Sequence, residues 1–361
     1  MNGKIICFTD SLGLGGAQRQ LVGLSVLLTK KGYNVTVLLY HDIPFYKHIL
    51  DESNIESIVI PGSSTIIGRI WHLLRYFRSL DPDIVIAYQS SPSLIACLLK
   101  PFLRYKKLIV SERNTSQKIS FKGRVLSLLW RFADYIVPNS YSQTNFIKKH
   151  IPKYSDKLVT ITNFIDTDLF IPATKAHVED AGALKIVSLG RISAQKNVLE
   201  YIKAVDIVKR RGLDIKVTWY GDTDNAEYDN ECRGLIEERN LMDVFKFHHA
   251  QKNVLQLYQE ADVFCLPSLC EGFPNVVCEA MSCGMPILCS NICDNPLIVG
   301  DGDNGILFSP ESAEYIAEAI IKFINLPEDK KTQMGIRSRE LALEKFSSDV
   351  FIKKYIDLIE H

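Results

Sequence analysis

Short runs of β-branched and aliphatic residues alternate with helical patterns through the first half of the chain. The runs occupy residues 4–10, 34–40, 55–61, 82–88, 107–112, 134–140 and 157–163. Between them, apolar residues recur on one helical face, first at Ile66, Ile70, Leu73, Leu74 and Phe77 and later at Phe121, Val125, Leu128, Leu129 and Phe132. Continuous Val, Ile and Leu runs joined by helices are typical of a parallel sheet covered on both faces. The first half therefore predicts a doubly wound α/β domain.

The same pattern starts again after a polar stretch at residues 172–183, which has no apolar period. Further strand-like runs follow at residues 185–190, 215–221, 245–249, 261–268 and 286–291. We therefore predict an N-terminal domain at 1–172 and a C-terminal domain at 173–346, both Rossmann-like. Ligands of open α/β sheets bind at the carboxyl ends of the strands, so we expect the two domains to face each other across a cleft and to share the site.

The last segment, residues 347–361, places Phe351, Tyr355, Leu358 and Ile359 at helical spacing. Two packings fit this pattern: the helix returns to the N-terminal domain, or it stays on its own domain.

The net charge of zero conceals a division between the halves. Residues 1–172 hold 21 Lys and Arg against 12 Asp and Glu, while residues 173–361 hold 21 against 30. A positive N-terminal half predicts an anionic partner. Nucleic acid fits poorly because no recognised binding module appears. Segments 100–107 and 122–132 interleave basic and large apolar residues, which suits an anionic membrane surface; the alternative is ordinary helices with solvated basic faces.

The first residues contain only a short apolar run that soon meets Asp10 and glycines, so they lack the length of a signal peptide or a membrane span. We expect a cytoplasmic protein that can lie peripherally on the inner face of the plasma membrane. The nine cysteines have irregular spacings among apolar residues, unlike the paired spacing of zinc sites. We expect buried, reduced thiols and no metal site.

A glycine-rich turn follows the first strand, where Gly13, Gly15 and Gly16 lead into an apolar helix. Such a turn lets the backbone approach a ligand, and the free N–H groups at a helix start favour an anion such as a diphosphate. The spacing is not that of the dinucleotide fingerprint, and a tight turn without ligand is the alternative.

A second candidate site follows the first strand of the second half, in GRISAQKN at 190–197. Arg191 is a fork-shaped donor suited to two phosphate oxygens, and Lys196 adds a compact positive charge. A solvated charged turn is the alternative, but two cations at the carboxyl edge of a sheet together favour a diphosphate.

The segment CEGFPNVVCEAMSCGMP, residues 270–286, has the marks of a helix of about ten residues. Pro274 suits the first turn and Gly284 the position just past the end. Glu271 then lies in the preceding loop and Glu279 more than one turn inside. The N–H groups of residues 275–277 need an anion or a hydroxyl as partner.

The two glutamates fit poorly as a hydrolytic pair. Five helical residues from Pro274 to Glu279 advance roughly 7.5 Å, with Glu271 further back, whereas retaining glycosidases need about 5 to 5.5 Å and inverting ones about 6.5 to 9.5 Å. Separate roles along one extended ligand fit better, with Glu271 near sugar hydroxyls and Glu279 on ribose hydroxyls. A structural Glu279 that caps a neighbouring loop is the alternative.

Taken together, these segments resemble the family-4 glycosyltransferases. The resemblance covers nearly the whole chain through GGAQRQ near the start, NFID at 163–166, GRISAQKN, YGD at 220–222 and the 270–286 segment. It implies the GT-B fold, two Rossmann-like α/β domains, and sugar transfer from a nucleotide diphosphate with retention and without a metal in the chemical step. NFID departs from the family pattern because Phe164 stands where a glycine is usual.

The resemblance also implies roles for individual residues. Arg191, Lys196 and Glu271 would be catalytic, with the two cations neutralising the departing diphosphate and Glu271 orienting the donor sugar. The implied donor-binding residues are Gly15, Gly16, Gly190, Lys252, Gly272, Phe273, Pro274, Asn275, Val276 and Glu279, with residues 250–252 beside the base. The implied acceptor or sugar-side residues are Glu112, Arg113 and Asn114.

The SERN segment, residues 111–114, is similar to relatives that extend lipid-linked oligosaccharides with N-acetylhexosamines. We therefore expect a hexose or N-acetylhexosamine donor, UDP-linked, and a lipid-diphosphate-linked or polysaccharide glycan acceptor, with no resident cofactor. Two other functions remain open: a nucleotide-sugar epimerase of the same architecture, and a non-catalytic sugar-binding regulator. The Glu-x7-Glu pattern does not point to the first, and the retained Arg191, Lys196, Glu271 and Glu279 argue against the second.

Overall fold

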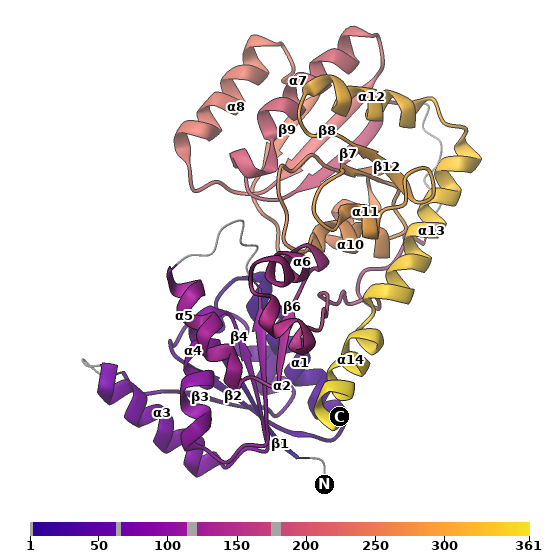
Figure 1. The fold of residues 1–361 in the computed structure, drawn as a ribbon. Coiled ribbons are helices and arrows are strands. Elements are labelled where there is room, and N and C mark those ends of the chain that lie inside the picture. Colours follow the sequence, from indigo (N-terminus) through magenta and orange to yellow (C-terminus); the bar gives the residue numbers. More distant parts are fainter. Residues whose placement is uncertain (1–2, 63–65, 114–120, 175–181) are drawn as a thin grey trace. The chain divides into compact units, whose positions relative to one another are not determined.

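A computed structural model describes residues 3–62, 66–113, 121–174 and 182–361. The chain forms two units: residues Met1–Phe164 together with Ser348–His361, and residues Ile165–Ser347. Each unit contains its own parallel sheet and is described by itself below (Figure 1).

The first unit has a six-stranded sheet in the order β3-β2-β1-β4-β5-β6, and all neighbouring strands are parallel. Its strands are β1 (Lys4–Thr9), β2 (Asn34–Leu39), β3 (Glu56–Val59), β4 (Ile84–Tyr88), β5 (Lys107–Glu112) and β6 (Tyr135–Pro138). Its helices are α1 (Gly16–Lys30), α2 (Lys47–Glu52), α3 (Ile66–Leu80), α4 (Ser90–Leu99), α5 (Phe121–Leu129), α6 (Tyr141–His150) and α14 (Ser348–Glu360), with short 3-10 turns η1 (Lys100–Phe102), η2 (Trp130–Phe132) and η3 (Pro152–Lys157).

Both faces of this sheet are buried, as the continuous apolar runs predict. On β1, Ile5 and Cys7 pack in one cluster with residues of α1 and α14, whereas Ile6 and Phe8 pack in another with residues of α3, α4 and α5. Alternate residues of a strand point to opposite faces, so a single apolar strand supplies both cores.

Two predictions for this unit are wrong in detail. Residues 157–163 form no strand; they contact β6 through the isolated bridge between Leu158 and Ile136 and through a hydrogen bond from Ile161 N–H to the carbonyl oxygen of Pro138 at 3.1 Å. Leu128 was expected on the buried face of its helix but is 62% exposed, while Leu126 is buried in its place.

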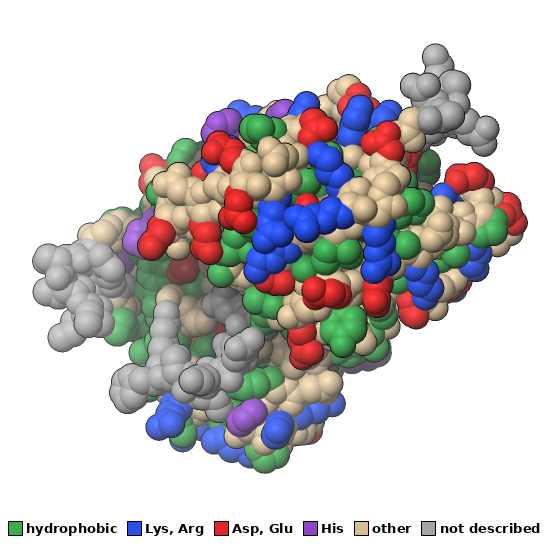
Figure 2. Space-filling view, turned by 90° about the horizontal axis from the view of Figure 1, so that it is seen from above, with side chains coloured by type: hydrophobic (Ala, Val, Ile, Leu, Met, Phe, Trp, Pro, Cys, Tyr) green, Lys and Arg blue, Asp and Glu red, His purple; other side chains and the backbone are tan. Residues whose placement is uncertain are grey.

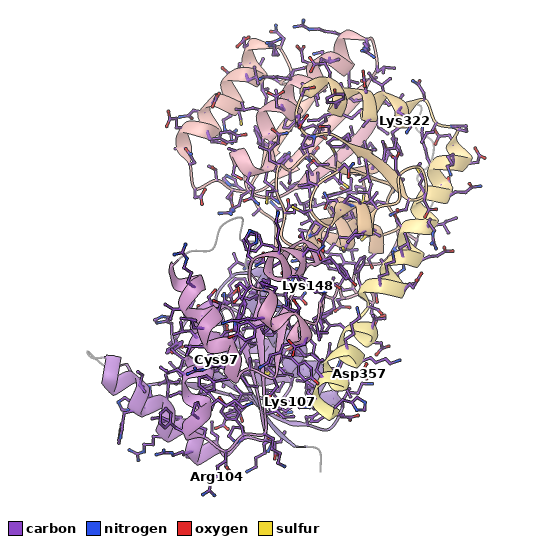
Figure 3. The ribbon with its side chains drawn as sticks, in the orientation of Figure 1. Cys97, Arg104, Lys107, Lys148, Lys322 and Asp357 are labelled. Carbon is purple, nitrogen blue, oxygen red and sulfur yellow. The ribbon has the colours of Figure 1, made fainter. Side chains whose placement is uncertain are left out.

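The C-terminal helix α14 packs on the first unit, which is one of the two packings expected from its pattern. Phe351, Tyr355 and Leu358 join the core cluster of α1 and β1. At the helix end, Nζ of Lys107 donates to the carbonyl oxygens of Leu358 (2.9 Å) and Ile359 (3.0 Å), where a cation complements the helix dipole (Figure 3).

The boundary between the units lies earlier than the predicted one at residue 172. Ile165 and Phe170 are buried in a core cluster of the second unit, and Nη1 of Arg339 donates to the carbonyl oxygen of Phe170 at 2.8 Å. Residues 165–172 are therefore part of the second unit because their apolar side chains pack there. Most of the predicted linker, residues 175–181, lies outside the described residues.

Phe164 ends the first-unit segment, and a glycine of α1 makes room for it. A Cβ atom on Gly23 would lie 2.3 Å from the ring of Phe164, and that ring also stacks near Phe351, with centroids 4.9 Å apart. The side chain of Gln20 binds both backbone groups of Phe164, at 2.8 and 3.0 Å. The first unit thus accommodates a phenylalanine at residue 164, where related sequences usually have a glycine.

The second unit repeats the architecture, with strand order β12-β11-β10-β7-β8-β9 and parallel neighbours. Its strands are β7 (Leu184–Leu189), β8 (Ile215–Tyr220), β9 (Phe245–His248), β10 (Val263–Leu266), β11 (Ile287–Ser290) and β12 (Gly305–Phe308). Its helices are α7 (Val198–Arg210), α8 (Ala226–Glu238), α9 (Leu255–Gln259), α10 (Asn275–Ser282), α11 (Asn295–Ile298), α12 (Ala313–Ile324) and α13 (Glu328–Phe346), with the 3-10 turn η4 (Ala194–Lys196). Strand β12 was not predicted.

The outer helices of the second unit carry charges of both signs. On α7, Lys209 pairs with Asp243 and Arg210 with Asp206. Figure 2 shows basic and acidic side chains interspersed on the face seen from above. The acidic excess of this half is therefore not gathered into one patch on that face.

Each sheet has a point where the strand order reverses, and open α/β sheets bind ligands at that point. In the first unit it lies between β1 and β4, and in the second between β7 and β10. The loops that follow these four strands are therefore the places to look for a site.

Candidate active site

An ion pair spans the reversal point of the second sheet. Lys196 lies in the loop after β7 and Glu271 in the loop after β10, and Lys196 Nζ is 2.5 Å from Glu271 Oε1. Both side chains are largely buried, and the same carboxylate oxygen accepts a hydrogen bond from Ser268 Oγ at 2.5 Å. The pair is thus fixed in place, and it joins two segments that are 75 residues apart in sequence.

The backbones of these two loops are also joined. Leu269 N–H donates to the carbonyl oxygen of Gln195 at 2.8 Å, and Gln195 Nε2 donates to the carbonyl oxygen of Cys270 at 2.8 Å. The 3-10 turn η4 therefore holds Lys196 against the loop that carries Glu271.

The loop after β8 lies against the loop after β7 at unusually short range. A Cβ atom on Gly221 would be 1.9 Å from the carbonyl oxygen of Gly190, so only glycine fits at 221. Gly190 itself has φ +153°, and its carbonyl oxygen accepts from Trp219 Nε1 at 2.8 Å. Ile192 N–H donates to the backbone carbonyl oxygen of Asp222 at 3.0 Å, and this hydrogen bond aligns the two loops.

Arg191 lies at the edge of this pair of loops and is exposed. Its Nη1 is 3.0 Å from Oδ2 of Asp224, and the two side chains are 66% and 70% exposed. Solvent screens such a pair, so the guanidinium can exchange its partner at little cost. The structure brings Gly190 and Lys196 together with Glu271 but gives Arg191 a carboxylate partner that the sequence did not suggest.

The helix of the 270–286 segment is close to the prediction. It spans Asn275–Ser282, eight residues rather than about ten, with Pro274 as the N-cap. The turn that ends the helix contains Gly284, which has φ +75°. Gly284 N–H donates to the carbonyl oxygen of Met281, and Met285 N–H donates to that of Ala280. This is the glycine-closed helix end expected from the sequence.

The prediction that the N–H groups at the start of α10 lack partners in the chain is wrong in part. Asn275 N–H donates to Phe273 and Val277 N–H to Pro274, both at 3.0 Å. Two of the three N–H groups at residues 275–277 therefore already have backbone partners.

Glu279 faces a buried tyrosine. It is 3% exposed, and its Oε2 accepts a hydrogen bond from the hydroxyl of Tyr258 at 3.0 Å. Glu271 has Lys196 and Ser268 as partners, so the two glutamates sit in separate environments. Tyr258 and Ser268 were missed from the sequence because nothing in α9 or in the run SLCEG marks them as polar partners of these carboxylates.

The other donor residues predicted in the second unit differ in burial. Phe273 and Pro274 are buried, Gly272 and Val276 are half-buried, and Lys252 is exposed in the loop before α9.

In the first unit, the glycine turn meets the carboxyl end of β1. Gly15 is the N-cap of α1 with extended backbone, and Gly16 is the first helical residue. No side chain caps this helix start, and its first turn contains no acidic residue. The start of α1 thus keeps the features that favour an anion, and anion binding at this glycine turn stays a prediction.

The reversal point of the first sheet carries one residue that sequence reasoning missed. Gln89, directly after β4, has φ +71°, a conformation rare for residues other than glycine, and its Oε1 accepts from Thr9 Oγ1 at 3.1 Å. The sequence AYQSSP gives no signal for this strained backbone.

Glu112 and Arg113 follow at the end of β5, and both are buried. Arg113 donates to Asn163 Oδ1 (2.7 Å), to Tyr88 OH (2.5 Å) and to Tyr355 OH (2.9 Å). Its guanidinium lies over the Tyr88 ring, 4.2 Å from the centroid. Arg113 therefore ties α14 and the NFID segment to the sheet, a contact set that the sequence did not predict; Asn114 lies outside the described residues.

The cysteines are free thiols, most of them buried; Cys270 is half-buried and Cys293 exposed. Burial raises the pKa of the Cys265 thiol to about 12, as expected for a packing residue. Among the described residues, no group of three His, Cys, Asp or Glu could hold a metal ion. In the same part of the chain, every helix is too short or too polar to cross a membrane.

Comparisons with known proteins identify families that match both halves of the chain. Residues 14–169 match the family described as Glycosyltransferase Family 4, and residues 172–341 match Glycosyl transferases group 1. A Campylobacter jejuni protein, N-acetylgalactosamine-N,N'-diacetylbacillosaminyl-diphospho-undecaprenol 4-alpha-N-acetylgalactosaminyltransferase, is 25% identical over 360 residues and 93% of each chain. An uncharacterized glycosyltransferase of Haemophilus influenzae is 23% identical over 98% of each chain.

Solved structures show the same fold. A glycosyltransferase from Rickettsia africae has a TM-score of 0.87 at 18% identity, covering 100% of this chain and 98% of its own. Anabaena HepE in complex with UDP has a TM-score of 0.86 at 20% identity, covering 99% of both chains. The predicted fold class, α/β with two Rossmann-like domains of the GT-B type, is confirmed.

The two family matches cover residues 14–169 and 172–341, which include every strand except β1 and every loop of the site in the second unit. The chain is therefore a glycosyltransferase of the family-4 type, with a group 1 match in its second unit.

Proposed function

We propose that the protein transfers a hexose or N-acetylhexosamine from a UDP-linked donor to a hydroxyl of a lipid-diphosphate-linked or polysaccharide glycan, with retention at the anomeric carbon. The observation that carries the proposal is the buried pair of Lys196 and Glu271 at the reversal point of the second sheet. It supplies a fixed cation for a diphosphate and a fixed carboxylate for sugar hydroxyls.

In the proposed reaction, the bond between the anomeric carbon and the diphosphate oxygen breaks. A bond forms from that carbon to the acceptor oxygen, and the acceptor proton passes to the departing diphosphate. Negative charge grows on the diphosphate in the transition state, where preorganised cations are most effective. Lys196 is held ready by Glu271, and Arg191 reaches the same edge of the sheet from the loop after β7.

The environment of Glu271 argues against its use as a nucleophile. Its Oε1 already accepts from Lys196 and Ser268, both at 2.5 Å. A carboxylate held by a cation and a hydroxyl is a weak nucleophile, so we assign Glu271 to orienting the donor sugar. We propose no metal for this step, because Arg191 and Lys196 offer the positive charge that a cation would otherwise supply.

Names of related proteins support the donor and acceptor classes. HepE was solved in complex with UDP, and the C. jejuni relative is named for transfer of N-acetylgalactosamine to a diphospho-undecaprenol glycan. The SERN segment supports the same acetamido-sugar class.

The deciding experiment is incubation of the protein with a panel of nucleotide sugars and a lipid-diphosphate-linked glycan. Transfer with an unchanged anomeric configuration, read by mass spectrometry and NMR, is expected. An isomerised donor would instead support the epimerase, and binding without turnover would support the regulator. A Glu271→Gln variant should lose transfer, whereas Lys209→Ala, at an exposed ion pair on α7, should keep it.

A membrane surface is the second part of this proposal. In the first unit, Trp71 on α3, Phe102 in η1 and Leu128 on α5 are 55%, 64% and 62% exposed. Large exposed apolar side chains beside basic ones suit the boundary between headgroups and acyl chains.

Basic residues accompany these apolar side chains. Arg78 and Arg104 line a cavity of about 410 Å³ together with Phe77, Phe102 and Tyr105, and Asp81 is the acidic residue of the same lining. Arg104 projects away from the body of the first unit (Figure 3). We therefore propose that this face rests on the anionic cytoplasmic side of the plasma membrane, where a lipid-linked acceptor is presented.

Flotation with vesicles of phosphatidylcholine and phosphatidylglycerol tests the membrane part separately. We expect binding that weakens with salt and is lost in a Phe102→Ser/Arg104→Glu variant, but is kept in Lys209→Glu. Failure of the wild-type protein to float would overturn this part and leave the transfer reaction untouched.

A further inference from the structure

The two cations of the proposed donor site each pair with a carboxylate, but the two ion pairs differ in burial. Lys196 and Glu271 form a buried pair, whereas Arg191 and Asp224 form an exposed one. A buried pair is kept because breaking it leaves an uncompensated charge. An exposed pair costs little free energy to separate, so Arg191 can leave Asp224 and bind an anion of higher charge, such as a diphosphate.

The position of Asp224 is set by its own loop. The hydroxyl of Thr223 donates to the carbonyl oxygen of Ile192 at 2.9 Å and accepts from Asn225 N–H at 3.0 Å. Asn225 in turn caps α8, since its side chain accepts from Tyr228 N–H at 3.1 Å. The residues on both sides of Asp224 are therefore anchored, and its carboxylate is held opposite Arg191.

A second carboxylate of the same loop is engaged elsewhere. Asp222 Oδ1 lies 2.7 Å from Nδ1 of His249, in the loop after β9. Asp222 thus has its own partner, which leaves Asp224 as the carboxylate of this loop that faces the guanidinium. YGDTD therefore carries two acidic residues with different contacts.

We propose that Asp224 is a positioning residue that competes with the diphosphate for Arg191 and so weakens the hold on donor and product alike. This inference rests on the proposed function, because it concerns the same diphosphate. With no anion bound, Asp224 holds the guanidinium at the rim of the site. Once the sugar has been transferred, the same carboxylate recaptures Arg191 and favours departure of the nucleotide.

The direct test is Asp224→Asn, which keeps the shape and removes the charge. Titration calorimetry with UDP and, as a second probe, inorganic diphosphate should show binding tightened about two- to five-fold at low salt, the range expected for an exposed ion pair. Because added salt screens exposed charges, the difference should shrink at high ionic strength.

A matched control removes the same charge elsewhere in the unit. Asp243 is also exposed, at 76%, and pairs with Lys209 at 3.1 Å. Asp243→Asn should leave UDP affinity unchanged. If both variants tighten binding equally, the effect comes from net charge alone and the proposal is overturned.

The role of Arg191 is tested by repeating Asp224→Asn in an Arg191→Ala background. If Asp224 acts through the guanidinium, the gain in affinity should largely disappear there. An equal gain in both backgrounds would overturn the proposal, as would unchanged or weaker UDP binding in the single variant.

Steady-state kinetics provide a readout that a purely structural role would not move. Asp224→Asn should lower the KM for the donor and strengthen product inhibition by UDP, with an unchanged melting temperature. Normal turnover with unaltered KM would reject this inference while leaving the glycosyltransferase function intact. Absence of transfer in wild type and variant together would count against the proposed substrates instead.

Discussion

The backbone of Gly190 and the α-carbon of Gly221 approach so closely that a methyl group on Gly221 would lie 1.9 Å from the Gly190 carbonyl oxygen. Because the obstructing atom is backbone, the clash cannot be relieved by a side-chain rotation. We predict that Gly221→Ala lowers the free energy of unfolding by about 3 kcal/mol or more and disturbs the loop of Arg191. Chemical denaturation and donor binding measure the two effects.

The control for this prediction is Gly234 in the middle of α8, where an added Cβ meets nothing within 4 Å. Alanine is the better helix former, so Gly234→Ala should raise the free energy of unfolding by about 0.5–1 kcal/mol. Equal behaviour of the two variants would show that the close approach at Gly221 does not matter.

Tyr258→Phe tests the role of the hydroxyl that binds Glu279. Loss of this hydrogen bond to a buried carboxylate should lower the free energy of unfolding by about 1–3 kcal/mol. If Glu279 holds the ribose, its looser position should also raise the donor KM. Tyr315→Phe, at an exposed tyrosine of α12, should change neither quantity.

Much of the fold follows from the sequence because burial on both faces leaves a strong mark. Strands such as β1 and β4 are largely continuous apolar runs, and Gly284 and Pro286 mark the end of α10. Residues 157–163 show a similar apolar pattern but form no strand. The pattern indicates that side chains are buried, but it does not indicate whether the backbone pairs with a neighbouring strand.

The site was predictable only in part, for a related reason. Arg191, Lys196 and Glu271 stand beside glycines and strand ends, where local pattern reveals them. The partners Asp224, Ser268 and Tyr258 depend on how separate loops meet, which no local spacing encodes. Likewise, Arg113 is recognisable as a charged residue after a strand, but its contacts with Tyr88 and Tyr355 arise from the return of α14.

Removal of divalent metal ions should leave both fold and transfer intact. The proposed reaction uses Arg191 and Lys196 to meet the charge of the departing diphosphate, so it needs no metal in the chemical step. Activity and melting temperature measured with excess EDTA should match those of the untreated protein. A loss that added Mg²⁺ or Mn²⁺ restores would contradict the metal-free step.

Replacement of Arg191 by alanine should separate catalysis from stability. The side chain is 66% exposed and makes one exposed ion pair, so the free energy of unfolding should change by less than about 1 kcal/mol. Turnover should fall about 100- to 1,000-fold, the usual loss when one preorganised group that stabilises developing charge is removed. Arg210→Ala, on α7 at the same exposure, should retain full turnover; near-normal turnover in Arg191→Ala would remove that residue from the site.

The buried pair of Lys196 and Glu271 allows the sharpest separation of folding from chemistry. Lys196→Met leaves Glu271 buried without its cation and should cost about 3–5 kcal/mol of stability as well as turnover. In the double variant Lys196→Met/Glu271→Gln the buried charge is gone, so denaturation should show most of the stability regained. Transfer should nevertheless stay low, because no cation meets the departing diphosphate. Recovery of transfer along with stability would mean that Lys196 serves the fold alone.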